Sequence, residues 1–272
     1  MARLKAVLWD VDGTIAESER DGHRVAFNRA FEACDLRWHW DEAHYGDLLR
    51  ITGGRERLLF DMNTRADAPT PSERDAVARA IHAKKNAFYA EMVLGGAIPL
   101  REGVLALMHE CRERGVKMGI ATTTSRSNVE ALMRMHLGQR WAEWFAVTVC
   151  GEDVQRKKPD PEVYLQALRA LGIAPLEAVA IEDAPGGLAA ARAADIPVVV
   201  TRSAYFAQAP IEGAVAVGPG LHDRRGWRPG LRLDADGQRG VGLDDIEGWC
   251  AQMDSVCDYP ANELNANIGA CE

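Results

Sequence analysis

A short apolar run, A-V-L-W at residues 6–9, leads directly into D-V-D-G-T at residues 10–14. Residues two apart in an extended segment point to the same side, so Asp10 and Asp12 can face one site at the carboxyl end of a strand. One carboxylate could attack phosphorus while the other handles a proton, because aspartate is an established nucleophile in covalent catalysis. The whole pattern is more specific than two acidic residues in a turn. It predicts a buried strand that carries a chemical site at its end.

The bulk composition is that of an ordinary globular protein. The chain has 272 residues, of which 47% are hydrophobic and 26% are charged, and this suits one or two domains with a sizeable core. A net charge of −8 argues against a general nucleic-acid binder, although a local positive cleft could still hold an anionic substrate. We expect a monomer that acts on a small molecule.

Two features of the sequence bear on location. The strand begins at Ala6, which leaves no room for a signal peptide, and no apolar run approaches the ~18 residues of a membrane span. The six cysteines are scattered and form no C-x-x-C pair, as in proteins of a reducing compartment. We therefore expect a cytoplasmic protein without membrane or nucleic-acid partners.

Helical and strand-like patterns alternate between residues 99 and 202. Helices are expected at 100–114, 128–137, 161–171 and 187–194, and strands at 116–121, 145–150, 178–181 and 196–201. Such alternation predicts a parallel sheet covered on both faces, which is an α/β, Rossmann-like core. A last strand at 215–217 and a terminal helix at 243–253 are also expected, and the Gly-, Arg- and Asp-rich stretch 218–245 is interpreted as a surface excursion.

The segment between the first strand and this core has a different pattern. Amphipathic helices are expected at 23–34, 41–49, 56–62 and 73–92, with no convincing strand among them. The predicted organisation is therefore an α/β core made of residues 1–15 and 98–255, an inserted helical cap at 16–97, and a loose tail at 256–272.

Polar residues gather where the expected strands end. Ligand sites of open α/β sheets lie beyond the carboxyl ends of the strands. Hydroxyls of Thr122 and its neighbours and the ammonium of Lys158 could hold phosphate oxygens, while Glu182 and Asp183 with Asp10 offer the oxygen ligands that Mg²⁺ prefers. Taken singly, these are a strand-end threonine, a surface lysine and an acidic helix cap. Their coincidence at successive strand ends favours a phosphoryl-transfer site.

The motif order D-V-D-G-T, T-T-T, K-K-P-D-P and I-E-D-A-P-G-G resembles the haloacid dehalogenase superfamily over residues ~5–200. This resemblance implies a Mg²⁺-dependent phosphatase in which Asp10 is the nucleophile and Asp12 the general acid and base. It further implies that Thr122, Thr123 and Lys158 bind phosphate. The implied Mg²⁺ ligands are Asp10, the main-chain carbonyl of Asp12, Glu182 and Asp183. A closed cap and a neighbouring carboxylate are expected to raise the pKa of Asp12.

The position and helical character of the cap narrow the resemblance. They are similar to the branch that contains β-phosphoglucomutase and phosphoglycolate phosphatase, and residues 10–31 with T-G-G-R-E-R at 52–57 are most similar to the CbbY-type phosphatases. That group is associated with the Calvin cycle and removes xylulose 1,5-bisphosphate, an inhibitor of Rubisco. Three alternatives stay open: a phosphosugar mutase, a 2-phosphoglycolate phosphatase, and a binding module without catalysis.

A sugar bisphosphate needs a second cationic site for the phosphate that is not cleaved. Arginine offers a fork suited to phosphate. The predicted substrate contacts in the cap are Glu17, His23, Tyr45, Arg50, Gly53, Gly54, Arg55 and Lys85. Arg57, Arg74 and Lys84 are interpreted as ordinary exposed helix residues. Two departures from the family pattern, Ala184 in place of Ser and Trp9 in place of Phe, remove no catalytic group.

Overall fold

The computed structural model describes residues 4–232 and 240–257. Six parallel strands form one sheet in the order β3-β2-β1-β4-β5-β6, with the first strand of the chain near its centre. The strands are β1 (Ala6–Trp9), β2 (Lys117–Ala121), β3 (Val147–Val149), β4 (Ala178–Glu182), β5 (Val198–Thr201) and β6 (Ala216–Gly218). The predicted parallel α/β sheet is confirmed, because every paired strand runs in the same direction.

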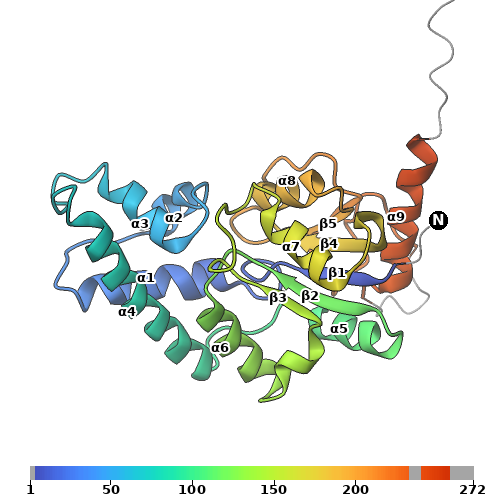
Figure 1. Ribbon diagram of the computed structural model, residues 1–272, viewed down its shortest axis with the longest axis horizontal. Coiled ribbons are helices and arrows are strands. Elements are labelled where there is room, and N and C mark those ends of the chain that lie inside the picture. Colours follow the sequence, from blue (N-terminus) through green and yellow to red (C-terminus); the bar gives the residue numbers. More distant parts are fainter. Residues whose placement is uncertain (1–3, 233–239, 258–272) are drawn as a thin grey trace, which may run out of the picture.

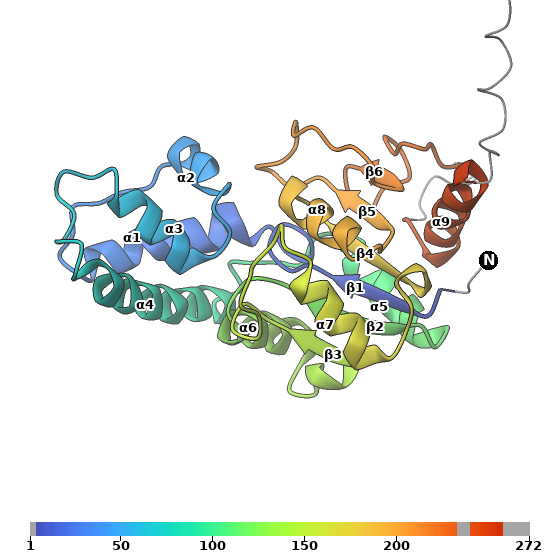
Figure 2. The same cartoon turned by 45° about the horizontal axis from the view of Figure 1, so that its top comes forward.

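Helices cover both faces of the sheet (Figures 1 and 2). They are α5 (Val104–Glu113), α6 (Arg126–Leu137), α7 (Glu162–Leu171), α8 (Pro185–Ala193) and α9 (Leu243–Cys257). Alternate residues of β1 enter different cores, as the two-residue period of a strand requires. Val7 and Trp9 pack with α5, α6 and α9, whereas Ala6 and Leu8 pack with α7 and α8.

A group of helices between β1 and α5 stands to one side of the sheet (Figure 1). They are α1 (Arg24–Glu32), α2 (Glu42–Leu48), α3 (Gly54–Met62) and α4 (Arg74–Leu94), preceded by a π-helical turn, η1 (Glu19–His23). These helices have their own aromatic core, which includes Phe27, Phe31, Trp40 and Tyr45. The segment is helical as expected; the exact domain boundaries stay a prediction.

The part of the chain after β6 is more buried than its sequence suggested. Leu221, Trp227 and Val241 are buried in the larger core, and the rings of Trp227 and Trp249 stack with centroids 4.7 Å apart. The interpretation of 218–245 as a surface excursion is therefore wrong for these buried residues, whereas residues 228–230 between them are exposed. Isolated apolar residues in a loop give no periodic pattern, yet they can still fill a gap beside a helix. The predicted loose tail lies outside the described residues, except for the end of α9.

Across the described ranges, no helix combines the length and the apolar character that crossing a bilayer requires.

Candidate active site

Three carboxylates meet where the two central strands end. The register of β1 and β4 continues one step further, because the N–H of Asp10 donates to the carbonyl of Ile181 (3.0 Å). This pairing brings Asp10 beside Glu182 and Asp183, which follow on the neighbouring strand. All three are buried, and one oxygen from each lies within 4.8 Å of the others. The predicted cluster is thus assembled by the parallel register of the sheet.

Lys158 lies against two of these carboxylates. Its Nζ donates to Asp10 Oδ1 at 2.6 Å and to Glu182 Oε1 at 2.7 Å, and a third bond reaches the carbonyl of Ala121 at the end of β2. Glu182 also accepts a hydrogen bond from the hydroxyl of Tyr164 on α7. Burial favours the neutral ammonium, but the two carboxylates outweigh it and raise the pKa of Lys158 above its usual value.

The carboxylate cluster carries more negative charge than Lys158 balances. Burial raises the pKa of Asp10 to about 7, with Glu182 and Asp12 adding to the rise and Lys158 opposing it. Burial also raises the pKa of Asp183 well above its usual value, and Asp10 and Glu182 contribute. A divalent cation would relieve both effects, and three buried carboxylate oxygens are the hard donors that Mg²⁺ takes. These residues therefore fit a divalent metal.

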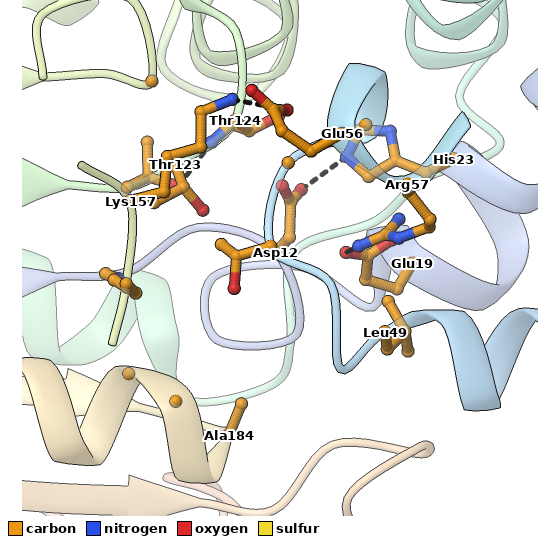
Figure 3. Close-up of a pocket in the computed structure, with 18 of the residues that line it drawn as sticks. Asp12, Glu19, His23, Leu49, Glu56, Arg57, Thr123, Thr124, Lys157 and Ala184 are labelled. Carbon is orange, nitrogen blue, oxygen red and sulfur yellow. Dashed lines mark hydrogen bonds and ion pairs between the residues drawn. The ribbon is translucent and has the colours of Figure 1, made fainter. Parts of the chain in front are cut away.

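Asp12 has a different environment, shown in Figure 3. Its Oδ1 accepts hydrogen bonds from Ser18 Oγ at 2.5 Å and from His23 Nε2 at 2.8 Å, and the His23 ring stacks on Tyr89. Burial alone would raise the pKa of Asp12, but His23, Ser18 and Lys85 lower it below its ordinary value. The expected upward shift is thus wrong for the protein without substrate, because these partners reach Asp12 only in the folded chain.

The π-helical turn η1 explains how two side chains of one turn reach this place. Glu19 and His23 both line the cavity described below. Gly22 packs so closely that a Cβ there would lie 2.6 Å from Ile98 Cδ1 and 2.9 Å from Tyr89 Cε2. π-turns within helices are often found at functional sites. Glu19 was not predicted; its only sequence signal is its position two residues after Glu17.

The threonines predicted to bind phosphate lie at the end of β2. The N–H of Thr122 continues the pairing with β3 by donating to the carbonyl of Val149 (3.0 Å). Asn128, in the first turn of α6, donates from Nδ2 to Thr124 Oγ1 at 3.2 Å. Thr122, Thr123 and Thr124 all line the cavity. Hydroxyls and the start of a helix therefore line the same space as the carboxylate cluster, at the end of the strand next to β1.

A cavity of about 1000 Å³ separates the sheet edge from the helical cap. Thirteen of the predicted site residues line it: Asp10, Asp12, His23, Arg50, Gly53, Gly54, Arg55, Lys85, Thr122, Thr123, Lys158, Glu182 and Asp183. Residues from distant parts of the sequence thus surround one space, as the strand-end argument expected.

Two predicted cap contacts lie outside this lining. Glu17 turns toward the core, where its Oε1 accepts a hydrogen bond from the N–H of Ala204 at 3.0 Å. Tyr45 is fully buried, and its hydroxyl donates to Glu19 Oε2 at 2.5 Å. The prediction that these two meet sugar hydroxyls directly is corrected by this placement. Tyr45 supports Glu19, which is the residue that faces the cavity.

Arg57 is the clearest error of the sequence interpretation. It was expected to be exposed, yet only 5% of its surface is accessible and it lines the cavity. Its Nη1 donates to the Tyr45 hydroxyl at 2.7 Å, and its Nη2 lies 3.6 Å from Glu19 Oε1. The spacing of Arg57, Leu58 and Asp61 along α3 is that of a buried helix face. An arginine on such a face was the signal that could have revealed it.

The predicted cap cations have different partners. Arg55 forms an ion pair with Asp75, and the guanidinium of Arg50 lies over the Phe60 ring at 5.0 Å. Lys85 is 3% exposed and lies over the rings of Phe27 and Tyr89. Burial lowers the pKa of Lys85 to about 8, against the attraction of Asp12 and Glu19.

Contacts across the cavity join the cap to the core. Lys157 Nζ, from the segment before α7, is 2.8 Å from Glu56 Oε2 on α3 (Figure 3). Asn86 on α4 donates to Ser125 Oγ at 3.3 Å, just before α6. The cap therefore contacts the segments that lead into α6 and α7, two helices that cover opposite faces of the sheet.

Fold and site together define a hydrolase class. Residues 4–195 match the haloacid dehalogenase-like hydrolases, and the protein belongs to this family. The predicted superfamily and the prediction of an enzyme of the phosphatase class are thereby confirmed.

Within this hydrolase family, the chain is similar to several CbbY proteins. The chain is 43% identical to protein CbbY (plasmid) of Cupriavidus necator over 222 residues, which cover 81% of this chain and 87% of that protein. It is 42% identical to protein CbbY of Rhodobacter capsulatus over 202 residues, covering 74% and 87%. A mutant of CbbY from Rhodobacter sphaeroides, crystallised in complex with xylulose-(1,5)bisphosphate, aligns with a TM-score of 0.73 and 38% identity, covering 78% and 92%.

Proposed function

We propose that this protein is a Mg²⁺-dependent phosphatase that hydrolyses xylulose 1,5-bisphosphate through an aspartyl-phosphate on Asp10. One observation carries the proposal: a buried carboxylate trio with Lys158 lies at one end of the cavity, and the cap supplies further cations to the same space. The relative crystallised with xylulose-(1,5)bisphosphate supports the choice of substrate.

Each catalytic group has a role that its surroundings favour. Asp10 attacks phosphorus, so that an oxygen–phosphorus bond to Asp10 forms as the bond to the sugar oxygen breaks. Lys158 and the hydroxyls of Thr122 and Thr123 hold the non-bridging phosphate oxygens. Asp10, Glu182, Asp183 and the main-chain carbonyl of Asp12 would hold Mg²⁺, whose charge would neutralise the phosphoryl group.

Asp12 moves the proton in both halves of the reaction. It donates a proton to the departing sugar oxygen, and it then takes one from the water that attacks the phosphorylated Asp10. The partners that lower its pKa hold one of its oxygens in a fixed position. An arriving phosphate dianion raises the pKa of a nearby carboxyl, and this favours the protonated form when the substrate is bound.

The cap supports a substrate with a second anionic group. Arg50, Arg55 and Lys85 line the cavity on the cap side, and Arg57 adds a fourth cation beside Glu19. A two-carbon phosphate would not need several cap cations, which disfavours 2-phosphoglycolate. Glu19 and His23 line the same cavity, and in this proposal they form hydrogen bonds with the sugar hydroxyls.

The direct test is phosphate release from xylulose 1,5-bisphosphate, ribulose 1,5-bisphosphate, β-glucose 1-phosphate and 2-phosphoglycolate, with Mg²⁺ and with a chelator. We expect a Mg²⁺-dependent preference for the xylulose compound that Asp10→Asn abolishes. Turnover led by another substrate would contradict the substrate assignment and leave the chemistry standing. Conversion of β-glucose 1-phosphate to an isomer without phosphate release would favour the mutase. An Asp10→Asn variant as active as the parent would refute the enzyme mechanism.

The role in the Calvin cycle, the cytoplasmic location, the monomeric state and the lack of nucleic-acid partners stay predictions. A sedimentation experiment would test the oligomeric state.

A further inference from the structure

Arg101 lies outside the cavity, yet it joins the three backbone segments that surround the metal-binding end. It stands between the cap and α5, and 12% of its side chain is exposed. Nη1 donates to the carbonyls of Gly13 and Thr201 and to Thr201 Oγ1, and Nη2 donates to the carbonyls of Arg202 (2.7 Å) and Pro219 (3.1 Å). One guanidinium thus connects the loop after Asp12 with the end of β5 and with the segment after β6.

Two of these segments enclose Asp183. Gly13 has a φ of +83°, and a Cβ there would lie 2.1 Å from Asp183 Oδ2, so the loop backbone is in direct contact with this carboxylate. On the other side, Ser203 follows the Thr201–Arg202 carbonyls and donates from Oγ to Asp183 Oδ2 at 2.6 Å. Arg101 therefore binds the backbone on both sides of one carboxylate.

Glu17 reinforces the same connection. Its Oε1 accepts the N–H of Ala204 and lies 3.9 Å from Arg101 Nε. The N–H of Arg101 itself donates to the carbonyl of Ile15 at 2.8 Å. The loop after Asp12 and the loop after β5 are thus held together at several points, with Arg101 between them.

We infer that Arg101 is a positioning residue, which fixes the Asp12–Gly13 backbone against Asp183 and so presets the oxygens for the divalent cation. This inference rests on the proposed function. A planar guanidinium can donate in two directions at once, whereas an ammonium is a single point charge on a flexible stem. Arg101→Lys therefore keeps the positive charge but loses the simultaneous hydrogen bonds to the loop after Asp12 and to the segments after β5 and β6. Loss of a group that orients metal ligands commonly costs about 10- to 100-fold in metal affinity or activity.

The test compares Arg101→Lys and Arg101→Gln with Arg224→Lys. Arg224 is a similarly buried guanidinium in the segment after β6, and it donates to the carbonyls of Arg232 and Gly240 and to Asp245, none of which contacts Asp183. Mg²⁺ affinity is measured by calorimetry without substrate, alongside Tm, kcat and the KM for the phosphosugar.

We expect both Arg101 variants to bind Mg²⁺ at least 10-fold more weakly and to have a lower kcat, with the KM for the phosphosugar changed less than about twofold. Arg224→Lys should lower Tm while its Mg²⁺ affinity stays parental. Parental Mg²⁺ affinity in Arg101→Lys, or an equal loss in Arg224→Lys, would overturn the inference alone. A parent protein that neither binds Mg²⁺ nor releases phosphate would overturn the proposed function as well.

Discussion

Gly187, in the first turn of α8, leaves the space that Glu182 occupies. A Cβ at this position would lie 1.9 Å from Glu182 Oε2 and 2.2 Å from Oε1, and the glycine is helical, so the conflict is with the side chain alone. Gly187→Ala therefore forces Glu182 away from α8. The neighbouring Gly186 has no atom within 4 Å of its Cβ position, and Gly186→Ala is a matched control in the same helical turn.

The size of the effect follows from the contacts that Glu182 would lose. To restore an ordinary contact, its carboxylate must retreat by about 1.5 Å. The 2.7 Å bond from Lys158 would then exceed hydrogen-bond length. Overpacking costs about 1–3 kcal/mol and a lost charged hydrogen bond about 1.5–3 kcal/mol. Alanine regains about 1 kcal/mol of helix propensity. We expect a net loss of about 1.5–5 kcal/mol, or on the order of 10 °C in Tm.

Thermal unfolding with and without Mg²⁺ measures this effect. Gly187→Ala should melt well below the parent and gain less stability from Mg²⁺, because Glu182 is displaced from the cluster. Gly186→Ala should melt at or slightly above the parent temperature. Equal melting temperatures and equal Mg²⁺ responses in the two variants would refute the steric argument.

Three further predictions concern charge. Lys85 must be protonated to hold an anion, and its pKa is about 8, so kcat/KM for the bisphosphate should fall about fivefold from pH 8 to pH 9 as this charge is lost. Lys85→Met should remove this decline, and the exposed Lys84→Met should keep it. Mg²⁺ at 100 times its Kd should raise the free energy of unfolding by about 2.7 kcal/mol, and an unchanged response in Asp183→Asn would contradict the proposed metal site. Arg57→Met leaves Glu19 and the Tyr45 hydroxyl without their buried partner and should cost about 3 kcal/mol in urea unfolding, whereas the exposed Arg79→Met should cost under about 0.5 kcal/mol.

Much of the fold could be predicted because its strands are short, apolar and separated by amphipathic helices. The β1 run and the carboxylates that follow it are local features, and local periodicity is what a sequence displays directly. The segment from Gly218 to Val241 was misjudged because its buried residues, such as Trp227, follow no period and depend on α9 for their contacts.

The residues of the candidate site were likewise predicted from the sequence only in part. Asp10, Thr122, Lys158 and Asp183 were predictable as residues that end or follow strands. Arg57 was missed because the burial of a residue on α3 depends on what packs against that helix. The pKa of Asp12 was predicted in the wrong direction because Ser18 and His23 approach its carboxylate only through the π-turn.

The amino-acid sequence by itself determined the class of fold, the strands that end in carboxylates and the resemblance to a family, since these depend on residues close together in the chain. Only the tertiary structure decided which cations are buried, which carboxylates share one space and which way their pKa values move. Burial and electrostatic interaction depend on distances between residues far apart in the chain. Arg101, which reaches Gly13, Thr201 and Pro219 together, has that role only once the sheet and its loops have assembled.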